Sequence, residues 1–196
     1  MRSSPRRHCY VARCAWGERT AVSAATALPR CPRCGSPFIR VARPKSLHEN
    51  FLRVLRRVPC QCQVCGRRCT SAQAGLTSVQ VPQDRRHFNR LATQLLARAM
   101  DRRGQERVGV ATNLSIAGCQ LQLPTQVADQ AILRLGLYPT HMAHPIIIEQ
   151  AIVRVLAPPV VGLAFVHVSL SAQRRLQQLV DELLREQWTS GDRERR

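Results

Sequence analysis

The chain has 196 residues and carries 30 Lys and Arg against 12 Asp and Glu, a formal net charge of +18. This length has room for one ordinary domain and a small module. It contains no apolar run near the roughly eighteen residues that cross a bilayer, so we expect no transmembrane segment and a cytoplasmic location. Residues 1–81 hold an excess charge of +13, against +5 in residues 82–196. This asymmetry favours polyanion contacts by the N-terminal part, although an Arg-rich solvated face would give the same count.

Residues 1–30 form a basic head. Arg2, Arg6 and Arg7 precede a mild Ala-rich stretch at 21–28, which is too polar and too late in the sequence for a signal peptide. We expect the head to be disordered. The alternative is a transit-like or membrane-surface arm, because the segment is Arg-rich and nearly free of acids.

Eight of the nine cysteines precede residue 70, and four of them form CxxC pairs. This spacing favours metal over disulfides. The strings CPRCG at 31–35 and CQVCG at 62–66 are two copies of one motif, CxxCG. In this motif two thiolates can converge on an ion, and the glycine allows the chain to turn back under it. The pattern predicts a zinc-ribbon-like module at 31–69, whose ligands are Cys31, Cys34, Cys62 and Cys65.

Four thiolates close the coordination shell of Zn(II), so we expect a structural metal. Cys60 and Cys69 belong to no CxxCG unit, but either could replace a ligand of the second pair. We interpret Cys9, Cys14 and Cys119 as bystanders, the last of them as a small buried residue of a strand.

The interval between the cysteine pairs predicts a short helix. Ser46 and Glu49 form a capping box, and the apolar residues between 47 and 58 make one face. Three arginines between 53 and 57 lie on the other side, where they either contact phosphates or are solvated.

The composition of residues 70–83 is typical of a linker. Beyond the linker, the pattern of residues 91–100 leaves their secondary structure ambiguous. A later stripe of apolar residues between 176 and 188 predicts an amphipathic helix that begins near Ser169 or Ser171. A charged tail occupies 188–196. Strands followed by a helix indicate an α+β fold. Short apolar runs predict strands at Val108–Thr112, Cys119–Leu123, Ala131–Leu137, Ile146–Leu156 and Val160–Val168.

Two further strings follow the linker in order, RRHFNR at 85–90 and NLSIAG at 113–118. Together they resemble the signature of the PilZ domain family, RRxxxR followed by (D/N)xSxxG, and GLAF at 162–165 resembles the start of one of the family's last strands. The resemblance covers residues 84–187. It implies a six-stranded antiparallel β-barrel closed by a C-terminal helix, which binds cyclic di-GMP. The residues that match the motifs are Arg85, Arg86, Arg90, Asn113, Ser115 and Gly118.

The chemistry of these residues agrees with a cyclic dinucleotide as ligand. An arginine fork can pair with guanine O6 and N7 or with a phosphate, and it can stack on a purine face. Asn113 can bond a guanine edge, Ser115 can donate to a phosphate or base, and Gly118 permits close backbone approach. The alternative is that the arginines are a solvated linker end and that the second string is only a tight turn.

We therefore expect a cyclic di-GMP effector in which nucleotide binding repositions the zinc module, with a downstream protein as a further partner. The alternative is a regulator that binds nucleic acid through residues 1–69, with the barrel as a passive domain. We expect no enzyme, because the sequence has no HExxH, GxSxG or phosphate-loop pattern. His141 and His144 are interpreted as loop residues.

Overall fold

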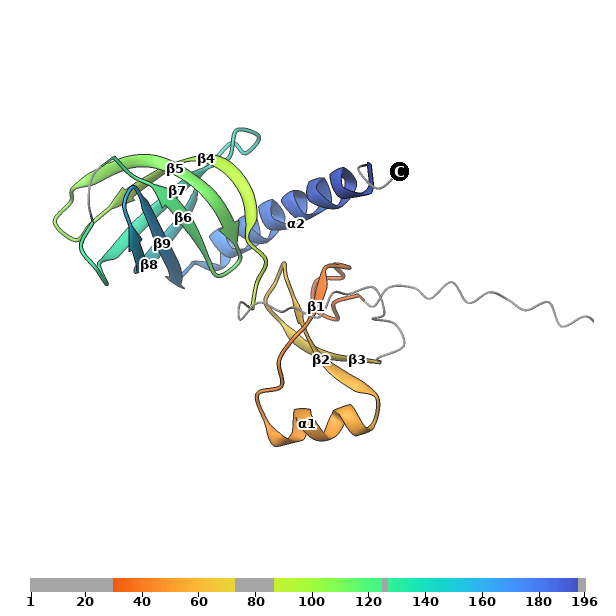
Figure 1. The fold of residues 1–196 in the computed structure, drawn as a ribbon. Coiled ribbons are helices and arrows are strands. Elements are labelled where there is room, and N and C mark those ends of the chain that lie inside the picture. The colour runs from red at the N-terminus through yellow and green to blue at the C-terminus, as the bar shows by residue number, and fades with distance from the viewer. Residues whose placement is uncertain (1–29, 73–86, 125–126, 194–196) are drawn as a thin grey trace, which may run out of the picture.

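The computed structural model describes residues 30–72, 87–124 and 127–193. They form a small three-stranded module, a closed six-stranded barrel and a long C-terminal helix (Figure 1). The α+β class, the antiparallel barrel and its helix, and the cysteine-bounded module are thus confirmed. The basic head, Cys9, Cys14, Arg85, Arg86 and most of the expected linker lie outside the described residues.

The module consists of β1 (Ile39–Val41), α1 (Leu47–Val54), β2 (Arg57–Cys62) and β3 (Arg68–Ala72), with the antiparallel order β1-β2-β3. The third strand runs through Ala72, into the segment that we expect to be linker from residue 70. It does so because Thr70 and Ser71 still have partners in β2, Pro59 and Val58. The sheet therefore ends later than its composition indicates.

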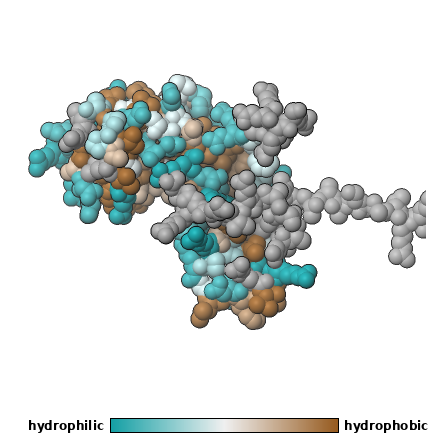
Figure 2. Space-filling model, in the orientation of Figure 1, coloured by the Kyte–Doolittle hydropathy of each residue, from teal (hydrophilic) through white to brown (hydrophobic). Residues whose placement is uncertain are grey.

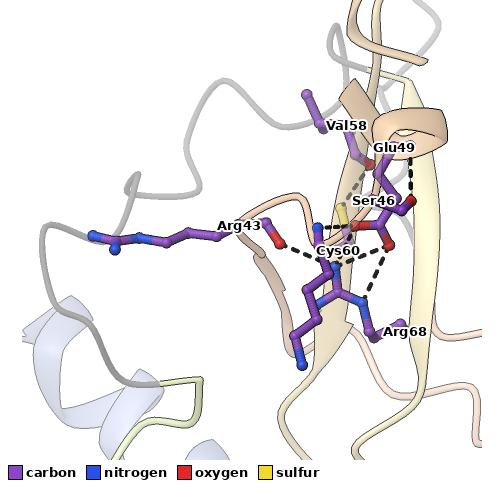
Figure 3. A network of polar contacts seen from close by, with 7 residues as sticks. Arg43, Ser46, Glu49, Val58, Cys60 and Arg68 are labelled. Carbon is purple, nitrogen blue, oxygen red and sulfur yellow. Dashed lines mark hydrogen bonds and ion pairs between the residues drawn. The ribbon is translucent and has the colours of Figure 1, made fainter. Parts of the chain in front are cut away.

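A polar network fixes the start of α1 (Figure 3). The Glu49 amide donates to Ser46 Oγ at 3.2 Å, and the Glu49 carboxylate accepts from the Lys45 amide at 2.6 Å. Arg68 Nη2 of β3 donates to Glu49 Oε2 at 2.8 Å and to the Arg43 carbonyl at 3.0 Å. The Lys45 amide and the Arg68 guanidinium together lower the pKa of Glu49. The Ser46 cap is present as expected, but the Glu49 side chain bonds the Lys45 amide in place of the Ser46 amide of a capping box, and Arg68 ties Glu49 to the sheet.

The apolar side chains of α1 are largely exposed. Leu47, Phe51 and Val54 keep 88%, 62% and 76% of their accessible surface, and Figure 2 shows apolar surface at the end of the module where α1 lies. An eight-residue helix is too short to be stable by propensity alone. We infer that the cap and the Glu49–Arg68 ion pair hold it in place.

The barrel is antiparallel and closes in the order β4-β5-β6-β9-β8-β7. The ambiguous segment at 91–100 is a strand, paired with β5 and β7, and Leu91, Ala97 and Ala99 point into the core while the residue after each points out. The strands are β4 (Leu91–Met100), β5 (Glu106–Ser115), β6 (Gly118–Gln122), β7 (Ile132–Tyr138), β8 (Ile146–Ala157) and β9 (Val160–His167).

The C-terminal helix α2 (Leu170–Arg193) packs against β4 and β8. Ser169 caps it, since its Oγ accepts from the Ala172 amide at 3.4 Å. The helix continues beyond Trp188 into the segment expected as a tail, where the hydroxyls of Thr189 and Ser190 both donate to the Glu186 carbonyl at 2.9 Å. No helix in the described ranges has an apolar stretch long enough to cross a membrane. The buried face of α2 consists of Ala172, Leu176, Leu179, Val180 and Leu184.

The module also contacts α2. Ser36 Oγ donates to Asp181 Oδ1 at 3.1 Å, and the rings of Phe38 and Trp188 meet edge to face with centroids 6.3 Å apart. These contacts join the cysteine-containing end of the module to the outer face of the helix.

Candidate functional site

The two CxxC pairs come together in space. The Sγ atoms of Cys31, Cys34, Cys62 and Cys65 all lie within 4.8 Å of one another, with Cys31–Cys65 and Cys34–Cys62 each at 3.6 Å. Zn–S bonds of about 2.3 Å place the sulfurs of a tetrahedral site about 3.8 Å apart. The cluster therefore has the donors and the spacing that Zn(II) requires, and these four thiolates would hold the ion.

The two CxxCG turns have the same backbone. Gly35 and Gly66 have φ values of 70° and 71°, and their amides donate to the carbonyls of Cys31 and Cys62 at 2.9 and 3.1 Å. A positive φ favours glycine. In both copies the glycine turns the chain back beside the four-cysteine cluster.

The environment of the thiols differs within the module. Burial raises the pKa of Cys31, but the amides of Cys34 and Arg33 outweigh burial and bring it to about 7. Cys60 is fully buried, and its pKa rises to about 11 because of that burial. Cys60 pairs across the sheet with Cys69, and among the described residues both lie outside the four-thiol cluster. The structure thus groups the four cysteines of the CxxCG units.

Strand register places three of the motif residues on one face of the barrel. Leu91 pairs with Leu114, and both are buried. Their neighbours Arg90, Asn113 and Ser115 consequently point outward, because alternate residues of a strand face opposite sides. The end of the arginine motif and the Asn/Ser motif therefore lie side by side.

The turn between β5 and β6 is held by its own hydrogen bonds. Ser115 Oγ donates to the Gly118 carbonyl at 3.0 Å, and the Asn113 amide group donates to Gln120 Oε1. A Cβ at Gly118 would lie 2.2 Å from the Leu163 carbonyl oxygen of β9. The glycine is required here by the close approach of a neighbouring strand, a constraint in addition to the ligand approach expected from the sequence.

A cavity of about 350 Å³ lies beside these residues. This volume is within the range of small-molecule sites. Arg90 and Arg154 contribute cationic groups, and no carboxylate is among the described residues that line it. Its lining combines both motifs, represented by His87, Phe88, Arg90, Asn113, Ser115 and Gly118, with residues of β8 and β9 that include Arg154 and Gly162. The hollow is suited to an anion that also has apolar surface.

Sequence reasoning did not identify Arg154 as a site residue. It is an exposed cation in an otherwise apolar part of β8, between the buried Val153 and the exposed Val155. The register between β8 and β9 shifts at this point. A bulge can redirect a side chain, and the lone charge within AIVRVLA was the signal available in the sequence.

The PilZ domain family model matches residues 84–182. Among solved structures, the chain is similar to the PilZ domain of CeSA from a cellulose-synthesizing bacterium, with 14% identity, a TM-score of 0.41, and coverage of 48% of this chain and 97% of that one. It is also similar to the PilZ domain of Escherichia coli YcgR with c-di-GMP, with 15% identity, a TM-score of 0.40, and coverage of 56% and 98%. For Bacillus subtilis MotI/DgrA the identity is 22%, the TM-score 0.43 and the coverage 54% and 53%. No curated protein matches the chain.

Proposed function

Because the chain belongs to the PilZ domain family, we propose that it is a cyclic di-GMP-binding effector of the bacterial cytoplasm. The ligand is bound at the cavity beside the turn between β5 and β6. The residues that we propose to bind it are Arg85, Arg86, Arg90, Asn113, Ser115 and Gly118, together with Arg154.

The observation that carries the proposal is the meeting of Arg90, Asn113 and Ser115 on one face of the barrel, beside a cationic cavity. Cyclic di-GMP is a dianion with two guanine edges. Arginine forks pair with its phosphates or with guanine O6 and N7, and the asparagine amide bonds a base edge. A lining without carboxylates among its described residues avoids repulsion of the phosphates.

The cysteine cluster has a structural role in this proposal. Cys31, Cys34, Cys62 and Cys65 would hold Zn(II) with no open position for a reacting group, so the metal would have no catalytic role. We propose that the protein binds and signals without a chemical step. We propose that nucleotide binding draws in the arginines at 85 and 86 and repositions the module, which then presents a changed surface to a downstream protein. Small-angle scattering at nucleotide saturation tests this step, and an unchanged profile would reject it.

Calorimetric titration with cyclic di-GMP tests the binding site itself. Arg90→Ala should weaken binding at least about tenfold, since a hydrogen bond to a charged group contributes about 1.5–3 kcal/mol. Arg102→Ala is the matched control, because it removes the same charge from the turn at the far end of β4, about 30 Å along the strand. An equal loss of nucleotide affinity in both variants would show that net charge attracts the nucleotide and that Arg90 belongs to no specific site.

Nucleic-acid binding by the module is a second candidate function. Residues 30–72 contain ten Lys and Arg and a single acid, Glu49, which is already paired with Arg68. Such a surface attracts phosphates, and its affinity should fall steeply with salt. Retention of the full chain on DNA or RNA at low salt, lost as salt rises, would support this function. Absence of binding at low salt would reject it.

A further inference from the structure

The second cysteine turn of the module holds the segment that leads into β4. We call residues 87–90 the arm; it contributes His87, Phe88 and Arg90 to the cavity. The side chain of Gln63, which lies between the ligands Cys62 and Cys65, bonds to this segment twice. A residue of the metal-binding turn therefore contacts the nucleotide-binding arm directly.

The two bonds from Gln63 flank Phe88. Gln63 Oε1 accepts from the Asn89 amide at 2.8 Å, and Gln63 Nε2 donates to the His87 carbonyl at 3.3 Å. The side-chain amide accepts a hydrogen bond from the residue after Phe88 and donates one to the residue before it. A neighbouring strand bonds to a backbone in the same pattern. The side chain of Gln63 thus takes the place of a neighbouring strand beside residues 87–89. Its two hydrogen bonds fix the backbone on both sides of Phe88.

Other contacts support this arrangement. Gln63 is 5% exposed, and its own amide donates to the Phe38 carbonyl at 2.9 Å, so its position is set by the module. The ring of Phe88 lies over Gly66 of the same turn. Arg40 of β1 donates to Asn89 Oδ1 at 2.7 Å. The arm is therefore held by the module on three consecutive residues immediately before Arg90.

We propose that Gln63 is a positioning residue for the nucleotide site, and that through it zinc binding by the module and cyclic di-GMP binding by the barrel are coupled. The second half of this inference rests on the proposed function. When the four thiolates hold the ion, the turn between Cys62 and Cys65 is rigid and presents the amide of Gln63 to the arm. When the turn is loose, the arm must be ordered by the nucleotide at a cost in affinity.

The size of the coupling follows from the two hydrogen bonds. At about 1 kcal/mol each, their loss raises the apparent dissociation constant for cyclic di-GMP by about tenfold, and by about thirtyfold at most. Coupling between two binding sites is reciprocal. Saturating nucleotide should therefore raise the affinity of the chain for zinc by a comparable factor, so that more chelator is needed to remove the ion at equilibrium.

The experiment compares the full chain with its Gln63→Ala and Ser36→Ala variants. Ser36 is the matched control, because it is buried near the first cysteine turn and contacts Asp181 of α2 but not the arm. Hydrogen exchange of the Asn89 amide is measured by NMR in the free protein, cyclic di-GMP affinity by calorimetry, and bound zinc by elemental analysis.

We expect Gln63→Ala to retain zinc, to lose protection of the Asn89 amide at least about tenfold, and to bind nucleotide about tenfold more weakly. Ser36→Ala should resemble the wild type in exchange and affinity. Unchanged protection of Asn89 in Gln63→Ala would overturn the positioning role, whether or not any nucleotide binds. If the wild type shows no heat with cyclic di-GMP, the proposed function and the coupling fail, while the exchange result still decides the positioning role.

A second part of the experiment uses metal removal. Zinc-depleted wild type should bind cyclic di-GMP about as weakly as zinc-loaded Gln63→Ala. Removing zinc from Gln63→Ala should weaken its nucleotide binding little further, since both changes free the same segment. Equal affinity of zinc-loaded and zinc-depleted wild type would overturn the coupling. If Gln63→Ala itself loses zinc, the elemental analysis detects it, and the exchange of Asn89 is then measured in zinc-depleted wild type. Retained protection there would assign the loss in the variant to Gln63 and would overturn the coupling to zinc, whereas loss of protection equal to that of the variant would overturn a role of Gln63 separate from the metal.

Discussion

Replacing Gly118 by alanine should damage the barrel at the candidate site. The new Cβ would lie 2.2 Å from the Leu163 carbonyl oxygen and 3.3 Å from the Ala164 Cα, so β6 and β9 must move apart by roughly 1 Å. Overpacking costs about 1–3 kcal/mol, and a weakened ladder hydrogen bond adds about 1 kcal/mol. We expect a loss of about 3 kcal/mol in the free energy of unfolding, measured by urea denaturation followed by far-UV circular dichroism.

Gly104→Ala is the matched control for this change. Gly104 has φ of 80° with no atom within 4 Å of an added Cβ, so only the left-handed backbone penalises the alanine, by about 1 kcal/mol. The difference of about 2 kcal/mol between the variants corresponds to about a thirtyfold difference in the unfolding equilibrium. A Gly118→Ala protein as stable as Gly104→Ala would refute the steric reasoning. The displaced turn should also weaken cyclic di-GMP binding, which Gly104→Ala leaves unchanged.

Three further predictions concern the metal, acid stability and the cavity. Cys62→Ser should lower zinc content below one ion per chain by elemental analysis, whereas Cys119→Ser in the barrel should keep it; equal content would contradict the ligand set. A backbone amide and an ion pair lower the pKa of Glu49, so the stability it gives is present above its unfolded pKa of about 4.3 and is lost as the pH falls below it. Glu49→Gln should therefore flatten the decline of unfolding free energy on acidification in urea titrations, and an unaltered decline would count against the network. Arg154→Ala should weaken cyclic di-GMP binding about tenfold in calorimetry, and unchanged affinity would remove it from the site.

Features that depend on a few adjacent residues could be predicted from the sequence. The CxxCG units bring their ligands together through a local turn, and Gly35 and Gly66 adopt the positive φ that this turn needs. The helix cap at Ser46 depends on residues three apart and is present as expected. Runs of β-forming residues likewise indicated most of the barrel strands.

Features that depend on tertiary contacts could not be predicted in the same way. Residues 91–100 have the apolar content of either a helix or a strand, and only pairing with β5 and β7 selects the strand. Arg154 belongs to no motif and Gln63 occupies a variable position of the second CxxCG unit, so their relevance comes from strands and turns that meet across the fold. The burial of the apolar residues of α1 could not be predicted either. A helical stripe of apolar residues indicates an apolar face, but it does not show whether another part of the chain covers that face.

A map of backbone amide shifts on titration with cyclic di-GMP tests the central claim most directly. Heteronuclear NMR on the full chain reports every amide in one experiment. We expect the largest changes at Arg90, at 113–118 and at 162–164, the segments that meet at the cavity. Changes confined to the opposite end of the barrel, around the turn at 101–104, or no changes at saturating nucleotide, would contradict the account.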